Sequence, residues 1–95
     1  MTPGPDRRCV MVRITGHVQG VGFRDWTVRR ALKLGLEGWV RNQPDASVKA
    51  VIAGDEDAIS HMLQAFMGGP DFAVVTDVIW EPADDVGLSG FRIAP

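Results

Sequence analysis

A glycine-rich segment at residues 16–24 constrains the fold most strongly, because the hydrophobic period changes across it. From about residue 8 to residue 18, apolar and other side chains alternate, a period of two that predicts a strand with one buried face. Over residues 23–34 the period becomes helical, and one helix side carries Phe23, Thr27, Ala31 and Leu34. Since glycine permits backbone angles that other residues avoid, the segment predicts a tight connection from a strand into a helix.

Two shorter apolar runs follow the first helix. Residues 36–42 and 47–53 predict strands joined by a turn at residues 43–46, where proline and aspartate favour a chain reversal. A second helix begins at residues 54–57, where the acids at 55–57 suit its positive end, and it has its own apolar stripe. The sequence Gly-Gly-Pro at residues 68–70 ends that helix.

The remaining elements complete a recognisable architecture. Residues 72–80 predict a fourth strand, and residues 91–93 predict a short closing strand after a polar loop. Two amphipathic helices must bury their apolar sides on one face of a largely antiparallel sheet. We therefore predict an α+β fold, a ferredoxin-like βαββαβ two-layer sandwich with a short extra C-terminal strand.

The length and composition fit one small domain. Of the 95 residues, 1–6 contain two prolines and a glycine and are expected to form a flexible leader, and 7–95 form the domain. The single cysteine, Cys9, cannot form an intrachain disulfide, which fits a reducing compartment. The sequence has no apolar run of membrane-spanning length, so we expect a cytoplasmic protein without membrane partners.

Charge is distributed unevenly. The net charge of −2 does not suggest a nucleic-acid-binding protein. One segment is nevertheless basic and carries Arg24, Arg29, Arg30 and Lys33. A local basic zone in an acidic chain favours a small anionic ligand.

The glycine loop could hold such an anion. Gly20 and Gly22 free the backbone so that successive amides can converge, and the following helix adds its positive end. Arg24 lies in that first turn, where a cation costs roughly 0.3–1 kcal/mol unless an anion offsets it. The pattern matches neither the dinucleotide fingerprint nor the Walker motif. By itself it also fits a purely structural turn with a solvent-exposed arginine.

Three blocks together resemble the acylphosphatase family. They are Gly-His-Val-Gln-Gly-Val-Gly-Phe-Arg at 16–24, Gly-Trp-Val-Arg-Asn at 38–42 and Gly-Phe-Arg-Ile at 90–93. The resemblance runs from about Cys9 to Pro95. It implies an acylphosphatase-like domain that hydrolyses the carboxyl-phosphate bond of acyl phosphates without a metal or other cofactor.

The resemblance also implies roles for individual residues. Arg24 would bind the phosphate, and Asn42 would position the attacking water. The backbone amides of the phosphate-binding loop would hold the phosphate oxygens, at Gln19, Gly20, Val21, Gly22 and Phe23. A small acyl phosphate is then the substrate, inorganic phosphate or a similar anion is a product or inhibitor, and a monomer is expected.

Two departures and two alternatives remain. The family often has Asp-Gly in the turn after the asparagine block, whereas this chain has Asp45 and Ala46. Because alanine tolerates positive φ poorly, a different turn type remains open here. Asp25 is expected to be a helix-start acid.

A non-catalytic anion-binding module and a single-stranded RNA-binding sheet are alternative functions, and the latter would need exposed aromatic residues on central strands.

Overall fold

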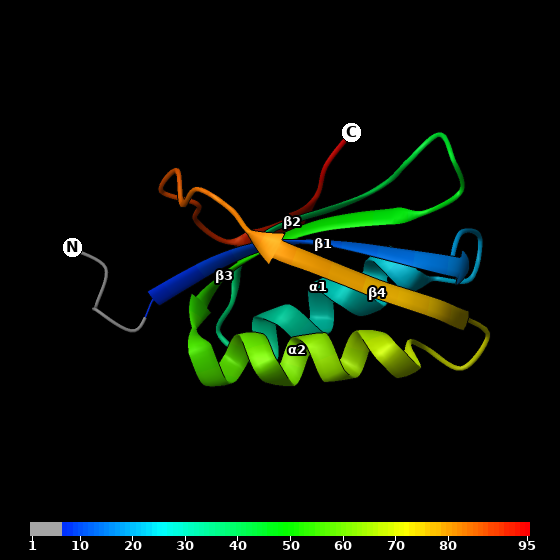
Figure 1. The fold of residues 1–95 in the computed structure, drawn as a ribbon, viewed down its shortest axis with the longest axis horizontal. Helices are drawn as coiled ribbons and strands as arrows, with labels where there is room; N and C mark the ends of the chain where they lie inside the picture. Colours follow the sequence, from blue (N-terminus) through cyan, green and yellow to red (C-terminus); the bar gives the residue numbers. More distant parts are fainter. Residues whose placement is uncertain (1–6) are drawn as a thin grey trace.

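The computed structural model describes residues 7–95, so the predicted leader lies outside the described residues. The elements follow one another along the chain in the predicted order (Figure 1). They are β1 (Arg7–His17), α1 (Phe23–Lys33), β2 (Glu37–Asn42), β3 (Val48–Asp55), α2 (Glu56–Gly68), β4 (Val74–Pro82) and β5 (Phe91–Ile93).

The strands form one sheet in the order β4-β1-β3-β2-β5. Neighbouring strands are antiparallel except for β2 and β5, which run parallel. Both helices cover the same face of the sheet (Figure 1). The predicted ferredoxin-like two-layer sandwich with an extra C-terminal strand is therefore confirmed.

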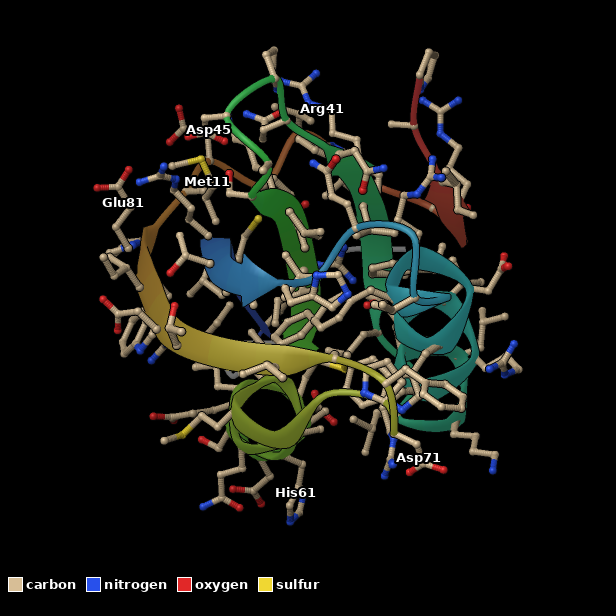
Figure 2. The ribbon with its side chains drawn as sticks, turned by 90° about the vertical axis from the view of Figure 1, so that its right-hand side faces the viewer. Met11, Arg41, Asp45, His61, Asp71 and Glu81 are labelled. Carbon is tan, nitrogen blue, oxygen red and sulfur yellow. The ribbon has the colours of Figure 1, made fainter. Side chains whose placement is uncertain are left out.

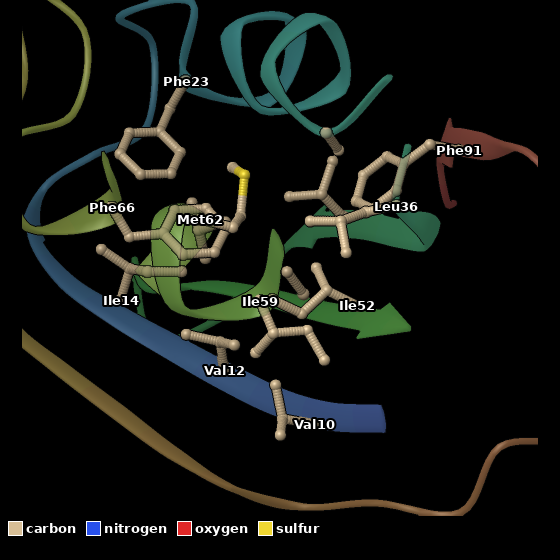
Figure 3. Close-up of a cluster of buried hydrophobic side chains, with 14 of the residues drawn as sticks. Val10, Val12, Ile14, Phe23, Leu36, Ile52, Ile59, Met62, Phe66 and Phe91 are labelled. Carbon is tan, nitrogen blue, oxygen red and sulfur yellow. The ribbon is translucent and has the colours of Figure 1, made fainter. Parts of the chain in front are cut away.

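The core lies between the sheet and the helices. The alternating side chains of β1 at Val10, Val12 and Ile14 are all buried, as their period predicts. They meet apolar side chains from both helices, among them Phe23 and Phe66, whose rings stack with centroids 6.1 Å apart (Figure 3). Phe23 is the first residue of α1, so this packing fixes the start of the helix against the core.

The fourth strand begins and ends two residues later than predicted. A turn hydrogen bond from the amide of Ala73 to the carbonyl of Pro70 keeps Phe72 out of the strand, and its ring is exposed. At the other end, Pro82 continues the pairing opposite Val10. Proline is tolerated there because β4 is an edge strand, where one row of amides needs no partner strand.

A bulge at the end of β1 turns the chain toward the first helix. The pairing of β1 with β4 shifts register between Thr15 and Gly16. Gly16 has φ 125°, and a Cβ atom there would lie 2.1 Å from the carbonyl oxygen of Val74. Only glycine fits this close approach, and the chain then leaves the sheet into the loop that precedes α1.

Candidate active site

The loop between β1 and α1 has the backbone geometry that its glycines predict. Gly20 and Gly22 both have left-handed φ angles, 73° and 76°. A Cβ atom at either position would meet nothing within 4 Å, so both glycines are needed for backbone conformation rather than for lack of space. Gly22 is also the N-cap of α1, and its carbonyl accepts the first helical hydrogen bond from Trp26.

Arg24 follows directly after the anchored Phe23. The phenyl ring of Phe23 is buried between Trp26 and Phe66, while the Arg24 side chain is exposed. Within residues 7–95, no side chain caps the start of α1 by a hydrogen bond. The free amides of the first turn therefore remain available to an anion beside the guanidinium group.

Asn42 reaches the same end of the molecule from the second strand. The β1–α1 loop and the turn between β2 and β3 lie at one end of the sheet (Figure 1). Asn42 is the last residue of β2, opposite Val48 of β3. The turn is closed by a hydrogen bond from the amide of Gln43 to the carbonyl of Ser47, 2.8 Å long.

The turn keeps a left-handed residue although it lacks glycine. Ala46 has φ 74° and is the only residue other than glycine with positive φ in the described range 7–95. The sequence left open a different turn type at Ala46. The turn nevertheless has a residue with positive φ at this position. Alanine instead bears the steric cost of that conformation, which is roughly 1–2 kcal/mol.

The side chain of Asp45 stabilises the turn. Its carboxylate accepts hydrogen bonds from the hydroxyl and the amide of Ser47 and pairs with Arg13 of β1. These hydrogen bonds lower the pKa of Asp45 to about 2, with Ser47 as the larger cause. Figure 2 shows Asp45 and Arg41 at the hairpin, far from His61 of α2.

Gln19 connects the glycine loop to this hairpin. Its side-chain amide Nε2 donates to the backbone carbonyls of Gln43 and Ser47, both at 2.9 Å. The two carbonyls flank the turn that follows Asn42. The loop before Arg24 and the strand end that carries Asn42 are therefore tied together by one side chain.

The two segments enclose a pocket of about 210 Å³. Among the described residues, it is lined by Val18, Gly20, Gly22, Phe23, Arg24, Asp25, Asn42 and Ile93. The structure thus brings together Arg24, Asn42 and three of the five predicted loop residues, whereas Gln19 and Val21 do not line the pocket. His17 is exposed and does not line it either.

Asn42 lines this pocket and has one side-chain atom without a hydrogen-bond partner in the described residues. Its side-chain oxygen Oδ1 is buried but accepts no hydrogen bond from residues 7–95. A buried acceptor without a partner is costly in a folded protein, typically about 1–3 kcal/mol. The carboxamide of Asn42 can both accept and donate hydrogen bonds, and Asn42 lines the same pocket as Arg24.

Three lining residues, Val18, Asp25 and Ile93, were not predicted as site residues. Asp25 was expected only as a helix-start acid, and Ile93 only as part of the closing strand. The closing block at 90–93 indicated the family but not the site, because the place of Ile93 depends on the parallel pairing of β5 with β2. Asp25 could have been found from its place directly after Arg24 in the first helical turn.

No group of three or more histidine, cysteine, aspartate or glutamate side chains among residues 7–95 could hold a metal ion. Within the same range, no helix is both long and apolar enough to cross a membrane.

Comparison with known proteins shows the family of this chain. The family model described as Acylphosphatase matches residues 10–93. An acylphosphatase of Sinorhizobium medicae is 57% identical over 89 residues, which cover 93% of this chain and 95% of that protein.

Solved structures give the same result. An acylphosphatase from Coxiella burnetii superposes with a TM-score of 0.90 at 35% identity, covering 94% of both chains. The acylphosphatase from Bacillus subtilis superposes with a TM-score of 0.89 at 33% identity, covering 92% of this chain and 98% of that one. The chain belongs to the acylphosphatase family, whose members hydrolyse acyl phosphates.

Proposed function

We propose that the 210 Å³ pocket is the centre at which this hydrolase cleaves acyl phosphates. Arg24 binds the phosphoryl group, and the amides from Gln19 to Phe23 hold its oxygens. Asn42 orients the attacking water. The observation that carries this proposal is that Arg24, Asn42 and the loop residues Gly20 and Gly22 line one pocket.

The reaction needs little from the protein beyond position and charge. The water oxygen bonds to phosphorus as the bond between phosphorus and the acyl oxygen breaks, and the acyl group leaves as a carboxylate. A carboxylate is a good leaving group, so no general acid is required. Phosphoryl transfer then depends on alignment and on donors placed around the phosphoryl oxygens, which Arg24 and the loop amides supply.

Asn42 orients the water without taking its proton. Its side-chain oxygen accepts a hydrogen bond from the water, and its amide nitrogen can donate to the substrate. An amide is no base near neutral pH, so the proton passes to a phosphate oxygen of the substrate. A pH profile of kcat that demanded a protein base with a pKa of about 7 would contradict this step.

Several further features belong to the same proposal. All residues of the proposed centre come from one chain, so a monomer is sufficient, and inorganic phosphate acts as product and inhibitor. The reaction proceeds without a metal ion. A cytoplasmic location remains a prediction from the sequence. Nucleic acid is not proposed as a ligand, since the central strands β1 and β3 carry no phenylalanine, tyrosine or tryptophan.

The test is hydrolysis of benzoyl phosphate in the presence of a chelator. Arg24→Ala and Asn42→Ala should each lower kcat/KM by about 100-fold or more, as removal of one transition-state donor does. Arg29→Ala is the matched control, because Arg29 is an exposed arginine of the same helix that does not line the pocket. Full activity of either pocket variant would remove the role proposed for that residue. Phosphate binding without turnover by the wild type would instead favour a non-catalytic anion-binding module.

A further inference from the structure

The rim of the pocket contains two residues that the proposed chemistry does not use. Of the apolar lining residues, Val18 and Phe23 are only 1% and 2% exposed and belong to the core. Ile93 is 40% exposed, and Asp25 is also exposed. These two rim side chains are therefore available to the part of a substrate that extends beyond its phosphate.

We propose that Ile93 and Asp25 determine the substrate class, by selecting acyl phosphates whose acyl group is apolar and uncharged. This inference rests on the proposed function, because it assigns the acyl side of the same pocket. Ile93 attracts the acyl group by apolar contact, and Asp25 repels acyl groups that carry a second carboxylate.

The backbone holds Ile93 close to Asn42. Strand β5 pairs in parallel with β2, and Ile93 lies opposite Val40. Hydrogen bonds from Ala94 to Val40 and from Gly38 to Gly90, each 2.8 Å long, fix the ends of this pairing. Since side chains two apart on a strand share a face, Asn42 lies on the same side of β2 as Val40.

This arrangement puts an exposed apolar side chain beside the proposed water-orienting residue. An apolar acyl group that covers Ile93 removes the surface of both from water, which favours binding. An acetyl group is too small to cover much of that surface. The contact should therefore distinguish large apolar acyl groups from small ones.

The charges of the pocket explain the role of Asp25. Arg24 is the one cation among the described residues that line the pocket. The phosphoryl group of any acyl phosphate already occupies Arg24. A second carboxylate on the acyl group would approach the Asp25 side chain, and no second cation among the described residues lines the pocket. Like charges so placed disfavour binding, and specificity commonly arises from such repulsion.

The experiment compares three substrates: acetyl phosphate, benzoyl phosphate and 4-carboxybenzoyl phosphate. Ile93→Ala should raise KM for benzoyl phosphate about fivefold while changing KM for acetyl phosphate less than about twofold. Asp25→Asn should raise kcat/KM for 4-carboxybenzoyl phosphate about threefold relative to benzoyl phosphate at low salt. That gain should shrink in about 0.5 M salt, because ions screen exposed charges.

Two controls test whether the effects are local. Ile79→Ala removes an exposed isoleucine from β4, and Asp57→Asn removes an exposed acid from α2; neither residue lines the pocket. Both controls should leave the ratios between substrates unchanged. Equal substrate ratios in the wild type and the rim variants would overturn this inference while leaving the proposed function intact. Absence of wild-type turnover with all three substrates would instead reject the proposed function, and this inference with it.

Discussion

The two helices of this small protein begin in contrasting ways. Helix α1 begins after Gly22, a left-handed residue with φ 76°, and its first turn contains Arg24 and Asp25. Helix α2 begins after Asp55, an extended residue with φ −63°, and its first turn contains two acids and no base. Within the described chain, neither helix start has a side-chain capping hydrogen bond.

The difference shows what makes a helix start a binding site here. At α2, Glu56 and Asp57 offset the positive end of the helix with charges of the protein itself. At α1, the cation Arg24 adds to the positive end, and the glycine loop gives a ligand access to the amides. The hairpin then contributes Asn42 from a second segment. A helix start alone would provide none of this specificity.

The largest expected effect is stabilisation of the protein by phosphate, which should depend on the start of α1 and not on the start of α2. Inorganic phosphate at about 100 times its Kd should raise the free energy of unfolding of the wild type by about 2.7 kcal/mol. Arg24→Ala should lose most of this stabilisation at the same phosphate concentration, because the guanidinium charge is gone. Urea denaturation with and without phosphate measures it.

The corresponding control lies at the other helix. Glu56→Gln should keep the full stabilisation by phosphate, since its carboxylate lies in the first turn of α2 and not at the pocket. An equal loss in this variant would mean that phosphate stabilises the protein through its general charge, and the contrast between the two helix starts would fail.

The second effect tests the backbone at the two N-caps. Gly22→Ala should destabilise the protein by about 1–2 kcal/mol, the cost of a left-handed conformation with a Cβ atom. Asp55→Ala should cost only about 0.5 kcal/mol, because its φ suits any residue and mainly a helix-end charge is lost. Thermal unfolding of both variants gives the comparison. Equal losses would show that the conformation of Gly22 carries no particular strain for other residues.

Much of this contrast was predictable from the sequence. The change of hydrophobic period at residues 16–24 placed a strand before the glycine loop and α1 after it, and the acids near residue 55 marked the start of α2. These signals are local, and local periodicity and charge depend only on neighbouring residues.

What could not be predicted depends on contacts between distant segments. The bridge from Gln19 to the hairpin joins residues more than 20 positions apart. Ile93 reaches the pocket only because β5 pairs with β2, and the pairing of a three-residue strand has no sequence signature of its own. The role of Asn42 likewise required the family resemblance, because an asparagine at a strand end is more often a turn former.

A third, smaller effect concerns the hairpin that completes the α1 site. Ala46→Gly should stabilise the protein by about 0.5–1 kcal/mol, since relief of the left-handed strain exceeds the extra entropy that glycine gives the unfolded chain. Urea denaturation at constant pH measures the change. Ala83→Gly, in the loop after β4, is the control and should not stabilise the protein. A loss of stability in Ala46→Gly would show that the φ of 74° is not strained for alanine.

The smallest effect is a pH dependence at the same hairpin. The folded pKa of Asp45 is about 2, below its value in the unfolded chain, because Ser47 and Arg13 hydrogen-bond to the ionised carboxylate. As the pH falls, Asp45 therefore becomes protonated in the unfolded chain before it does in the folded protein. The stabilisation by Asp45 is complete above a pH of about 4 and is lost as the pH falls through about 2.

Asp45→Asn isolates this contribution, since asparagine can still accept the hydrogen bonds from Ser47 but does not titrate. The wild type and the variant should differ in urea midpoint at pH 6, and this difference should narrow between about pH 4 and pH 2 as Asp45 becomes protonated. A constant difference between the wild type and Asp45→Asn over this range would mean that Asp45 holds the turn by its shape and not by its charge. The α1 site would then depend on electrostatics only at Arg24 and the helix end.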